Sequence, residues 1–189
     1  MRIEFVTIKG TWREVADAAR TTINLEPGQK APPSAWKRRM LLSEHSPIRH
    51  LTVRWKWTGL KFWISTHFVR HHVGIEHWVS TQRTDQPGVE TDVDRDTFPQ
   101  GAVVNHECLA SAQALITVSR KRLCTHAGIQ TRAAWQALLD ALEPQEPELV
   151  SVCVRECIYR GFCPERKPCG YSRTPEFTRQ LALYRGAEP

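Results

Sequence analysis

The chain has 189 residues, of which 41% are hydrophobic, and this length suits one folded domain with a sizeable core better than two full domains. Its formal net charge is +6, and a positive balance favours partners that carry phosphate, such as nucleotides, phosphate-rich cofactors and nucleic acids. No apolar stretch approaches about 18 residues and no apolar run follows a basic start, so we expect a cytoplasmic protein that is neither secreted nor membrane-spanning.

The N-terminal part of the chain predicts a strand followed by two helices. Residues 1–8 alternate apolar and charged side chains, which is the period of a strand. Thr11 and Glu14 are spaced as a capping box and predict the start of a helix. Residues 24–34 concentrate proline, glycine and asparagine and predict a loop, after which residues 37–42 restart a short helix.

The middle of the chain predicts a strand, a helix and a long loop. Residues 50–58 alternate large apolar and basic side chains, as in a half-buried strand, and Gly59 is expected to end it. The aromatic-rich residues 61–72 fit a helix better than a strand. Residues 84–101 are acidic and rich in proline and glycine, so they predict an exposed excursion that could serve as a lid.

Two further helices are predicted in the second half, at residues 110–124 and 131–142, from apolar side chains at helical spacing. Prolines end the second of these helices, and a cluster of cysteines and a basic tail follow. We therefore divide the chain into a main domain at residues 1–149 and a cysteine-rich, metal-binding appendage with a basic tail at residues 150–189.

The most distinctive group of residues is Arg70-His71-His72, followed after seven residues by Ser80 and then by Arg83. A guanidinium offers phosphate a planar fork of donors, and an imidazole can donate a hydrogen bond or stack on a planar ring. These side chains therefore predict an anion-binding pocket. The alternative is a solvated helix end, where basic residues are favoured by the helix dipole.

The same group resembles the motif of the flavin-dependent thymidylate synthases, the ThyX family. The family carries Arg-His-Arg, seven residues, a serine and, close behind it, an arginine. Arg70, His71 and Ser80 match this pattern in register. The turn at residues 46–50, Ser-Pro-Ile-Arg-His, likewise resembles the Ser/Thr-Pro-x-x-His turn that precedes a strand and a helix in this family.

Residues 115–122 and the helix that contains Trp135 resemble the later helices of the family, so the resemblance covers roughly residues 1–142. It implies an α+β fold in which an antiparallel sheet packs with helices, and a main domain that binds nucleotide and flavin. It also implies a homotetramer whose sites lie between subunits. The cysteine-rich appendage is an addition that the resemblance does not explain.

The activity that the resemblance implies is a methyltransferase of dTMP biosynthesis. Reduced FAD supplies hydride while a one-carbon unit passes from methylenetetrahydrofolate to C5 of a pyrimidine nucleotide, and NADPH is the reductant. Arg70 and Arg122 are the implied catalytic residues. The implied substrate-binding residues are Arg70, His67, Ser80, Arg83 and Arg122. The residues assigned to the flavin are Ser46, Arg70, His71, His72 and Trp78, the last as a ring that could stack.

Several positions depart from the family pattern. His72 replaces the second arginine of the motif, His67 replaces an amide residue, the pair His77-Trp78 replaces an Asn-Glu pair, and Gln113 stands where an arginine is common. Losing charge-assisted contacts weakens the binding of anions, so flavin affinity or substrate identity is expected to differ. The alternatives are a flavin-free relative that binds nucleotide without turnover, and a zinc-containing protein that binds nucleic acid.

The appendage begins with Cys153, Cys157, Cys163 and Cys169, a density of thiols that predicts a metal site in a reducing compartment. Structural zinc is the first interpretation, with an iron–sulfur cluster or free thiols as alternatives. Cys153 lies in an apolar stretch, so we favour Cys124 as the fourth ligand beside Cys157, Cys163 and Cys169.

Overall fold

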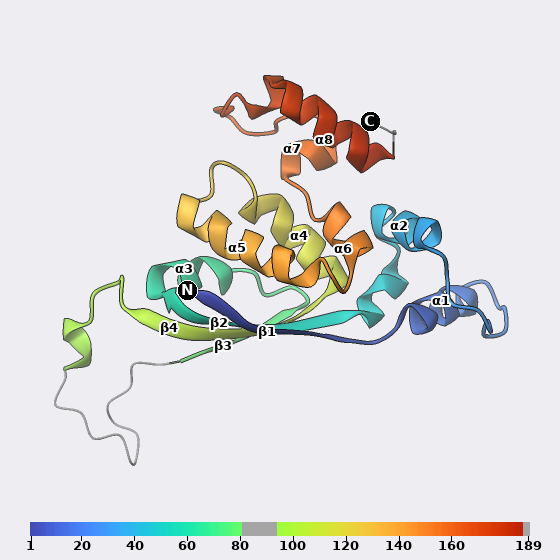
Figure 1. Cartoon of the computed structure of the whole chain (residues 1–189), viewed down its shortest axis with the longest axis horizontal. Coiled ribbons are helices and arrows are strands. Elements are labelled where there is room, and N and C mark those ends of the chain that lie inside the picture. Colours follow the sequence, from blue (N-terminus) through green and yellow to red (C-terminus); the bar gives the residue numbers. More distant parts are fainter. Residues whose placement is uncertain (81–93, 187–189) are drawn as a thin grey trace, which may run out of the picture.

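The computed structural model describes residues 1–80 and 94–186 of the chain (Figure 1). The expected excursion at 84–101 lies outside the described residues except for its last part, which contains a short 3₁₀ helix. The elements in chain order are β1 (Arg2–Lys9), α1 (Trp12–Thr21), α2 (Ser34–Leu42), η1 (Ser46–His50), β2 (Thr52–Lys61), α3 (Phe62–Phe68), β3 (Ile75–Val79), η2 (Arg95–Thr97), β4 (Val103–Ser111), α4 (Ala112–Arg122), α5 (Ile129–Leu142), α6 (Pro147–Val152), α7 (Glu156–Arg160), η3 (Tyr171–Arg173) and α8 (Pro175–Arg185).

The four described strands form one antiparallel sheet in the order β1-β2-β4-β3. The predicted α+β class, with an antiparallel sheet packed with helices, is therefore confirmed. Gly59 does not end β2, as the sequence suggested, because the strand continues to Lys61. The register with β4 shifts between Trp57 and Leu60, and Gly59 has a φ of +68°, which a glycine adopts without strain.

Helices α3, α4, α5 and α6 lie on one side of the sheet and cover the core (Figure 1). The inward side chains of β2 supply the centre of this core, where Trp55 and Trp57 meet edge to face with ring centroids 5.4 Å apart. Trp135 of α5 packs edge-on against Trp55 at 6.0 Å, and Phe68 of α3 stacks on Trp57 at 4.7 Å. The aromatic strand at residues 50–58 thus fixes the position of α3, whose last turn leads into the motif.

The other face of the sheet carries polar and charged side chains. Arg54 pairs there with Glu107 at 2.6 Å, and Lys56 with Glu4 at 3.2 Å. Trp78 on β3 is 52% exposed on this face. No described helix covers it (Figure 1), so the sheet has one face packed on the core and one open face.

Local signals in the sequence place several boundaries correctly. The Thr11 hydroxyl accepts a hydrogen bond from the backbone N–H of Glu14, and the Glu14 carboxylate accepts one from the N–H of Thr11, which confirms the predicted capping box. The predicted helix at 110–124 begins later, at Ala112, because residues up to Ser111 belong to β4. The Ser111 hydroxyl caps the helix by accepting from the N–H of Ala114.

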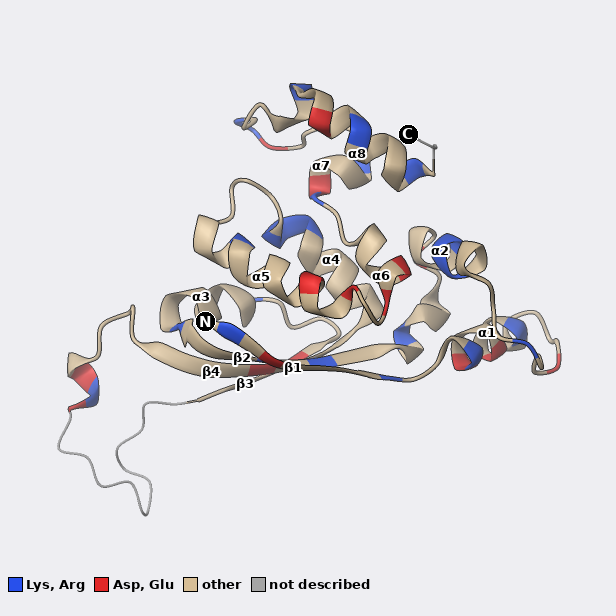
Figure 2. Ribbon diagram, viewed as in Figure 1, with Lys and Arg blue, Asp and Glu red and all other residues tan. Residues whose placement is uncertain are grey.

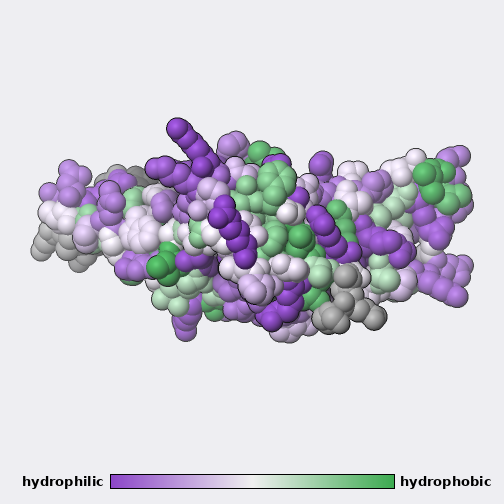
Figure 3. All heavy atoms as spheres, turned by 90° about the horizontal axis from the view of Figure 1, so that it is seen from above, coloured by the Kyte–Doolittle hydropathy of each residue, from purple (hydrophilic) through white to green (hydrophobic). Residues whose placement is uncertain are grey.

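The C-terminal helices α7 and α8 pack against each other around a small second core that contains Ile158 and Phe177. They lie beyond α4, on its side away from the sheet (Figure 1), and Figure 2 shows the basic C-terminal end of α4 below them. The surface seen from above is a mosaic of hydrophilic side chains and small hydrophobic patches (Figure 3). None of the described helices has the length and apolar character needed to cross a membrane.

Candidate functional site

The motif lies immediately after α3. Phe68, the last residue of that helix, is buried against Trp57, and the backbone N–H of His71 donates to the carbonyl oxygen of Phe68 at 2.9 Å. This turn leaves Arg70 and His72 exposed and brings His71 to a half-buried position. The sequence placed these residues at the end of a helix, and the helix is shorter than the predicted range 61–72.

Arg122, the last residue of α4, holds the motif through two hydrogen bonds. Its Nε donates to Nε2 of His71 at 2.7 Å, and its NH2 donates to the carbonyl oxygen of His67 at 2.6 Å. Because a guanidinium can only donate, Nε2 of His71 is the acceptor and the ring is neutral, with its proton on Nδ1. Burial and then the charge of Arg122 lower the pKa of His71 to about 4, in agreement with a neutral ring.

The two guanidiniums of Arg70 and Arg122 lie close enough to affect each other, since burial and then Arg70 lower the pKa of Arg122. Among the described residues, no carboxylate forms an ion pair with either side chain. Hydrogen bonds to described residues use two of the five N–H groups of Arg122. The site therefore has positive charge and donors that an anionic ligand could satisfy.

His67 is the fourth of the predicted site residues in this group, and its Nδ1 lies 3.0 Å from the hydroxyl of Thr131 on α5. Burial, followed by the charges of Arg122 and Arg70, lowers the pKa of His67. A neutral His67 beside two guanidiniums leaves the positive charge of the site on the arginines alone. The structure thus brings together His67 of α3, Arg70 and His71 of the turn that follows it, and Arg122 at the end of α4.

A chain of hydrogen bonds that includes residues of the sheet supports the motif. Nε2 of His77 lies 2.6 Å from the carbonyl oxygen of His71, Nδ1 of His77 lies 2.9 Å from Nε2 of His106, and Nδ1 of His106 lies 3.0 Å from the Ser65 hydroxyl. The carbonyl can only accept, so with neutral rings every donor is fixed: Ser65 donates to His106, His106 to His77, and His77 to His71. Burial, more than the charge of His77, lowers the pKa of His106 to about 3 and keeps its ring neutral.

Ligand atoms of His77, His106 and Cys108 lie within 4.8 Å of one another, a grouping that can indicate a metal. The hydrogen-bonded chain already gives a partner to each ring nitrogen of both histidines, so we assign no metal here. Sequence reasoning missed Ser65 and His106. The signal was present, because His106 occupies an inward position of β4 among apolar neighbours, where a polar side chain needs a partner.

Ser80 and Trp78 lie on the opposite side of the sheet from this group. Strand β3 turns Ile75 and His77 toward the core, so the alternate residues Trp78 and Ser80 point to the open face. The Ser80 hydroxyl accepts from the backbone N–H of Asn105 at 2.8 Å. Within one chain the structure therefore does not bring Ser80 or Trp78 to Arg122.

Two further predicted positions lie elsewhere. Ser46 opens η1 and lines a separate shallow cavity of about 380 Å³ together with Arg49 and His50. Arg83 lies outside the described residues. Gln113, where the family often has an arginine, donates to the carboxylate of Glu44, which also pairs with Arg120.

The four cysteines predicted as metal ligands all line one small cavity. They are free thiols that come from the residues after α4, from α7 and from the segment before η3: Cys124, Cys157, Cys163 and Cys169. Cys153 is buried against the core and lines a different cavity, and burial raises its pKa to about 12. The structure thus groups Cys124, and not Cys153, with the other three, and metal binding by them remains a prediction.

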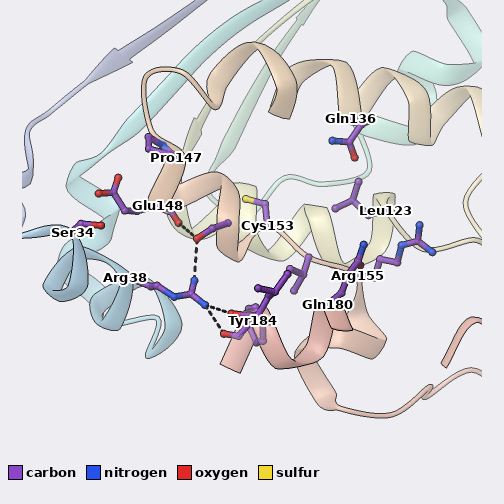
Figure 4. A pocket seen from close by; sticks show the side chains of 13 residues that line it. Ser34, Arg38, Leu123, Gln136, Pro147, Glu148, Cys153, Arg155, Gln180 and Tyr184 are labelled. Atoms are coloured by element: carbon purple, nitrogen blue, oxygen red, sulfur yellow. Dashed lines mark hydrogen bonds between the residues drawn. The ribbon is translucent and has the colours of Figure 1, made fainter. Parts of the chain in front are cut away.

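A cavity of about 670 Å³ lies between α2, α6 and α8 and contains no residue of the motif (Figure 4). Arg38 crosses one side of it, donating to the Ser151 hydroxyl at 3.0 Å and to the carbonyl oxygens of Leu183 and Tyr184, each at 2.7 Å. These contacts join α2 to α6 and to the end of α8. Arg38 thereby acts as a structural tie, and we do not place the functional site there.

Comparison with known proteins identifies the fold. Two crystal structures of the flavin-dependent thymidylate synthase ThyX from Helicobacter pylori with FAD and dUMP are similar to this chain, with TM-scores of 0.65 and 0.66 and 15% identity. The similarity covers 82% of this chain in both, and 100% and 99% of those chains. No protein-family model matches the chain, and no curated protein matches it by sequence. The ThyX-like fold that the motif suggested is therefore confirmed at the level of structure.

Proposed function

We propose that the chain binds a pyrimidine nucleotide at Arg70 and Arg122 and catalyses flavin-dependent transfer of a one-carbon unit from methylenetetrahydrofolate to C5 of its ring. The observation that carries this proposal is the pair of guanidiniums, with no carboxylate partner among the described residues, at the motif position of a ThyX-like fold. A nucleotide combines the phosphate and the ring carbonyls that such donors recognise.

Each side chain has a distinct role in this proposal. Arg70 is exposed, so its guanidinium is accessible to a phosphate, and His67 lies beside it. Arg122 is held in place by the neutral ring of His71, so its remaining N–H groups can donate to a ring carbonyl without a large entropic cost. Donation to that oxygen stabilises the negative charge that develops there as C5 becomes nucleophilic.

The residues assigned to the flavin fit an anionic, aromatic group. The Ser46 hydroxyl, with Arg49 and His50 around the same cavity, suits phosphate, and the exposed ring of Trp78 suits stacking. His71, His72 and Arg70 would complete the binding of the flavin. Bound FAD would supply the hydride for the reaction, and NADPH would be its reductant.

A homotetramer accounts for the separation of these residues. Ser80 and Trp78 lie on the open face of the sheet, whereas Arg70 and Arg122 lie at the ends of α3 and α4 on the covered side. A single chain cannot combine them in one pocket without unfolding the sheet. We propose that neighbouring copies bring the two sets together.

The test uses the purified full-length chain. We expect flavin absorbance in the preparation or after addition of FAD, saturable binding of dUMP by calorimetry, and dTMP formation with methylenetetrahydrofolate and NADPH. Nucleotide binding without any flavin binding would favour the flavin-free relative and refute the proposed reaction. Binding to polynucleotides with a steep salt dependence, and none to dUMP, would favour the nucleic-acid-binding alternative.

A further inference from the structure

The cavity formed by Cys124, Cys157, Cys163 and Cys169 joins parts of the chain that are distant in sequence. Cys124 follows Arg122 at the end of α4 by two residues, whereas the other three cysteines belong to the C-terminal unit. Arg155 and Thr125, whose side chains are 3.4 Å apart, line the same cavity. The four thiols therefore stand where the C-terminal unit meets the main domain.

The segment between the last two α-helices has little else to hold it. Residues 162–169 neither donate nor accept a backbone–backbone hydrogen bond with any described residue. The segment contains Pro164 and Pro168, and the glycines at its two ends have positive φ values, 81° at Gly161 and 88° at Gly170. Ordering such a segment costs conformational entropy that other contacts must offset. Ligation through Cys163 and Cys169 would supply those contacts.

Donors already surround the sulfurs as they do in metal–thiolate centres. Thr125, Arg155 and Tyr171 line the cavity beside the four thiols, and their side chains can donate hydrogen bonds to sulfur. Hydrogen bonds to sulfur and a nearby cation stabilise thiolate ligands. The cation is Arg155, whose guanidinium lies 4.2 Å from the centroid of the Tyr171 ring.

The spacing of the sulfurs around this cavity distinguishes a single metal ion from a cluster. The free volume of the cavity is about 10 Å³, room for about one water molecule. A single zinc ion with Zn–S bonds of about 2.3 Å holds its sulfurs about 3.8 Å apart and leaves no such room between them. Among the described residues, three or more potential ligand atoms lie within 4.8 Å of one another at His77, His106 and Cys108, and not at the four cysteines. The four thiols are therefore spaced more widely than zinc requires. A cubane cluster places four iron and four sulfide ions between its cysteine sulfurs and therefore holds them farther apart than a single ion does.

We propose that these four cysteines bind a [4Fe–4S] cluster that fastens the C-terminal unit to the end of α4. The sequence alone favoured zinc for the same ligands, and the spacing of the thiols reverses that preference. The cluster has a structural role close to Arg122. This proposal does not depend on the reaction proposed above.

The decisive measurement is the content of iron, acid-labile sulfide and zinc per chain after anaerobic purification of the full-length protein. The wild type should contain about four iron and four sulfide per chain, with the broad visible absorbance of a cluster. Cys163→Ser and Cys169→Ser should each lose most of the iron. Cys153→Ala is the matched control, because this thiol lies nearby but lines another cavity, and it should retain the wild-type iron content.

Gel filtration and tryptophan fluorescence distinguish a variant that has lost a metal ligand from one that has not folded. The metal content of the wild type tests the cluster even if a serine variant fails to fold. One zinc per chain without iron would overturn the cluster in favour of the zinc interpretation. Absence of both metals would overturn the metal centre altogether. Full iron in a folded Cys169→Ser protein would remove that residue from the ligands. Titration with dUMP tests the nucleotide site separately.

Discussion

Replacing Arg70 with alanine tests the nucleotide site with little risk to the fold. The side chain is exposed and makes no hydrogen bond or ion pair with a described residue, so we expect the free energy of unfolding to change by no more than about 0.5 kcal/mol. A hydrogen bond to a charged group contributes about 1.5 to 3 kcal/mol. At about 1.4 kcal/mol per factor of ten, dUMP affinity should fall about 10-fold to 150-fold.

The control for this variant is Arg13→Ala, which removes an exposed guanidinium from α1 and changes the net charge equally. Calorimetric titration with dUMP at low and moderate salt should show a large loss for Arg70→Ala and a small, salt-sensitive one for Arg13→Ala. Arg70→Lys keeps the charge without the planar fork and should fall between them. Equal losses in both alanine variants would mean that only long-range charge attracts the nucleotide, and would refute a contact at Arg70.

Three further outcomes follow from the geometry. In the folded chain the pKa values of His71 and His106 are about 4 and about 3, below the ordinary value of 6.5. As the pH falls, these two histidines therefore take up protons in the unfolded chain before they do so in the folded chain. The free energy of unfolding should be constant above pH 6.5 and fall from there toward about pH 4. Urea unfolding at a series of pH values measures this, and His106→Gln should flatten the fall. Ser65→Ala should cost about 1 to 3 kcal/mol at neutral pH in the same assay, since it leaves buried Nδ1 of His106 without a partner; no loss would contradict this hydrogen bond. Trp78→Ala should change the free energy of unfolding by no more than about 0.5 kcal/mol, because the side chain is exposed. The molar mass measured by light scattering should fall from that of a tetramer to that of smaller species. An unchanged molar mass would show that this face is not part of the interface.

Periodic and capping signals in the sequence were sufficient to predict much of the secondary structure of the main domain. The alternation of residues 50–58 and the capping box at Thr11 identified β2 and α1, because in both cases neighbouring residues determine the local structure. Strand β3 was missed because five residues, with a histidine and a tryptophan at successive positions, show too little alternation. Strand β4 was missed because its inward side chains include His106, which breaks the apolar pattern.

The site was predicted less completely than the fold, for a physical reason. Arg70 and His71 were found because they are adjacent in sequence, and Arg122 because it resembles a family position. The contacts that support them from the sheet, from Ser65 through His106 and His77 to the carbonyl oxygen of His71, join α3, β4 and β3 and have no sequence spacing that would reveal them. Burial sets the pKa values there, and burial depends on the packed tertiary structure.

The departures from the family pattern can be understood together through charge. The pair His77-Trp78 stands where the family has Asn-Glu, and Nε2 of His77 bonds to the carbonyl oxygen of His71, whose ring in turn accepts from Arg122. The glutamate of that pair is replaced by Trp78, whose position lies on the open face of the sheet, so its loss removes a negative charge from the face opposite Arg122. The loss of this glutamate and the replacement of an arginine by His72 change the net charge in opposite directions, while Arg70 and Arg122 keep their charge without a carboxylate partner among the described residues. A site altered in this way should retain its affinity for the anionic part of a nucleotide, so the change in specificity is expected at the ring and not at the phosphate.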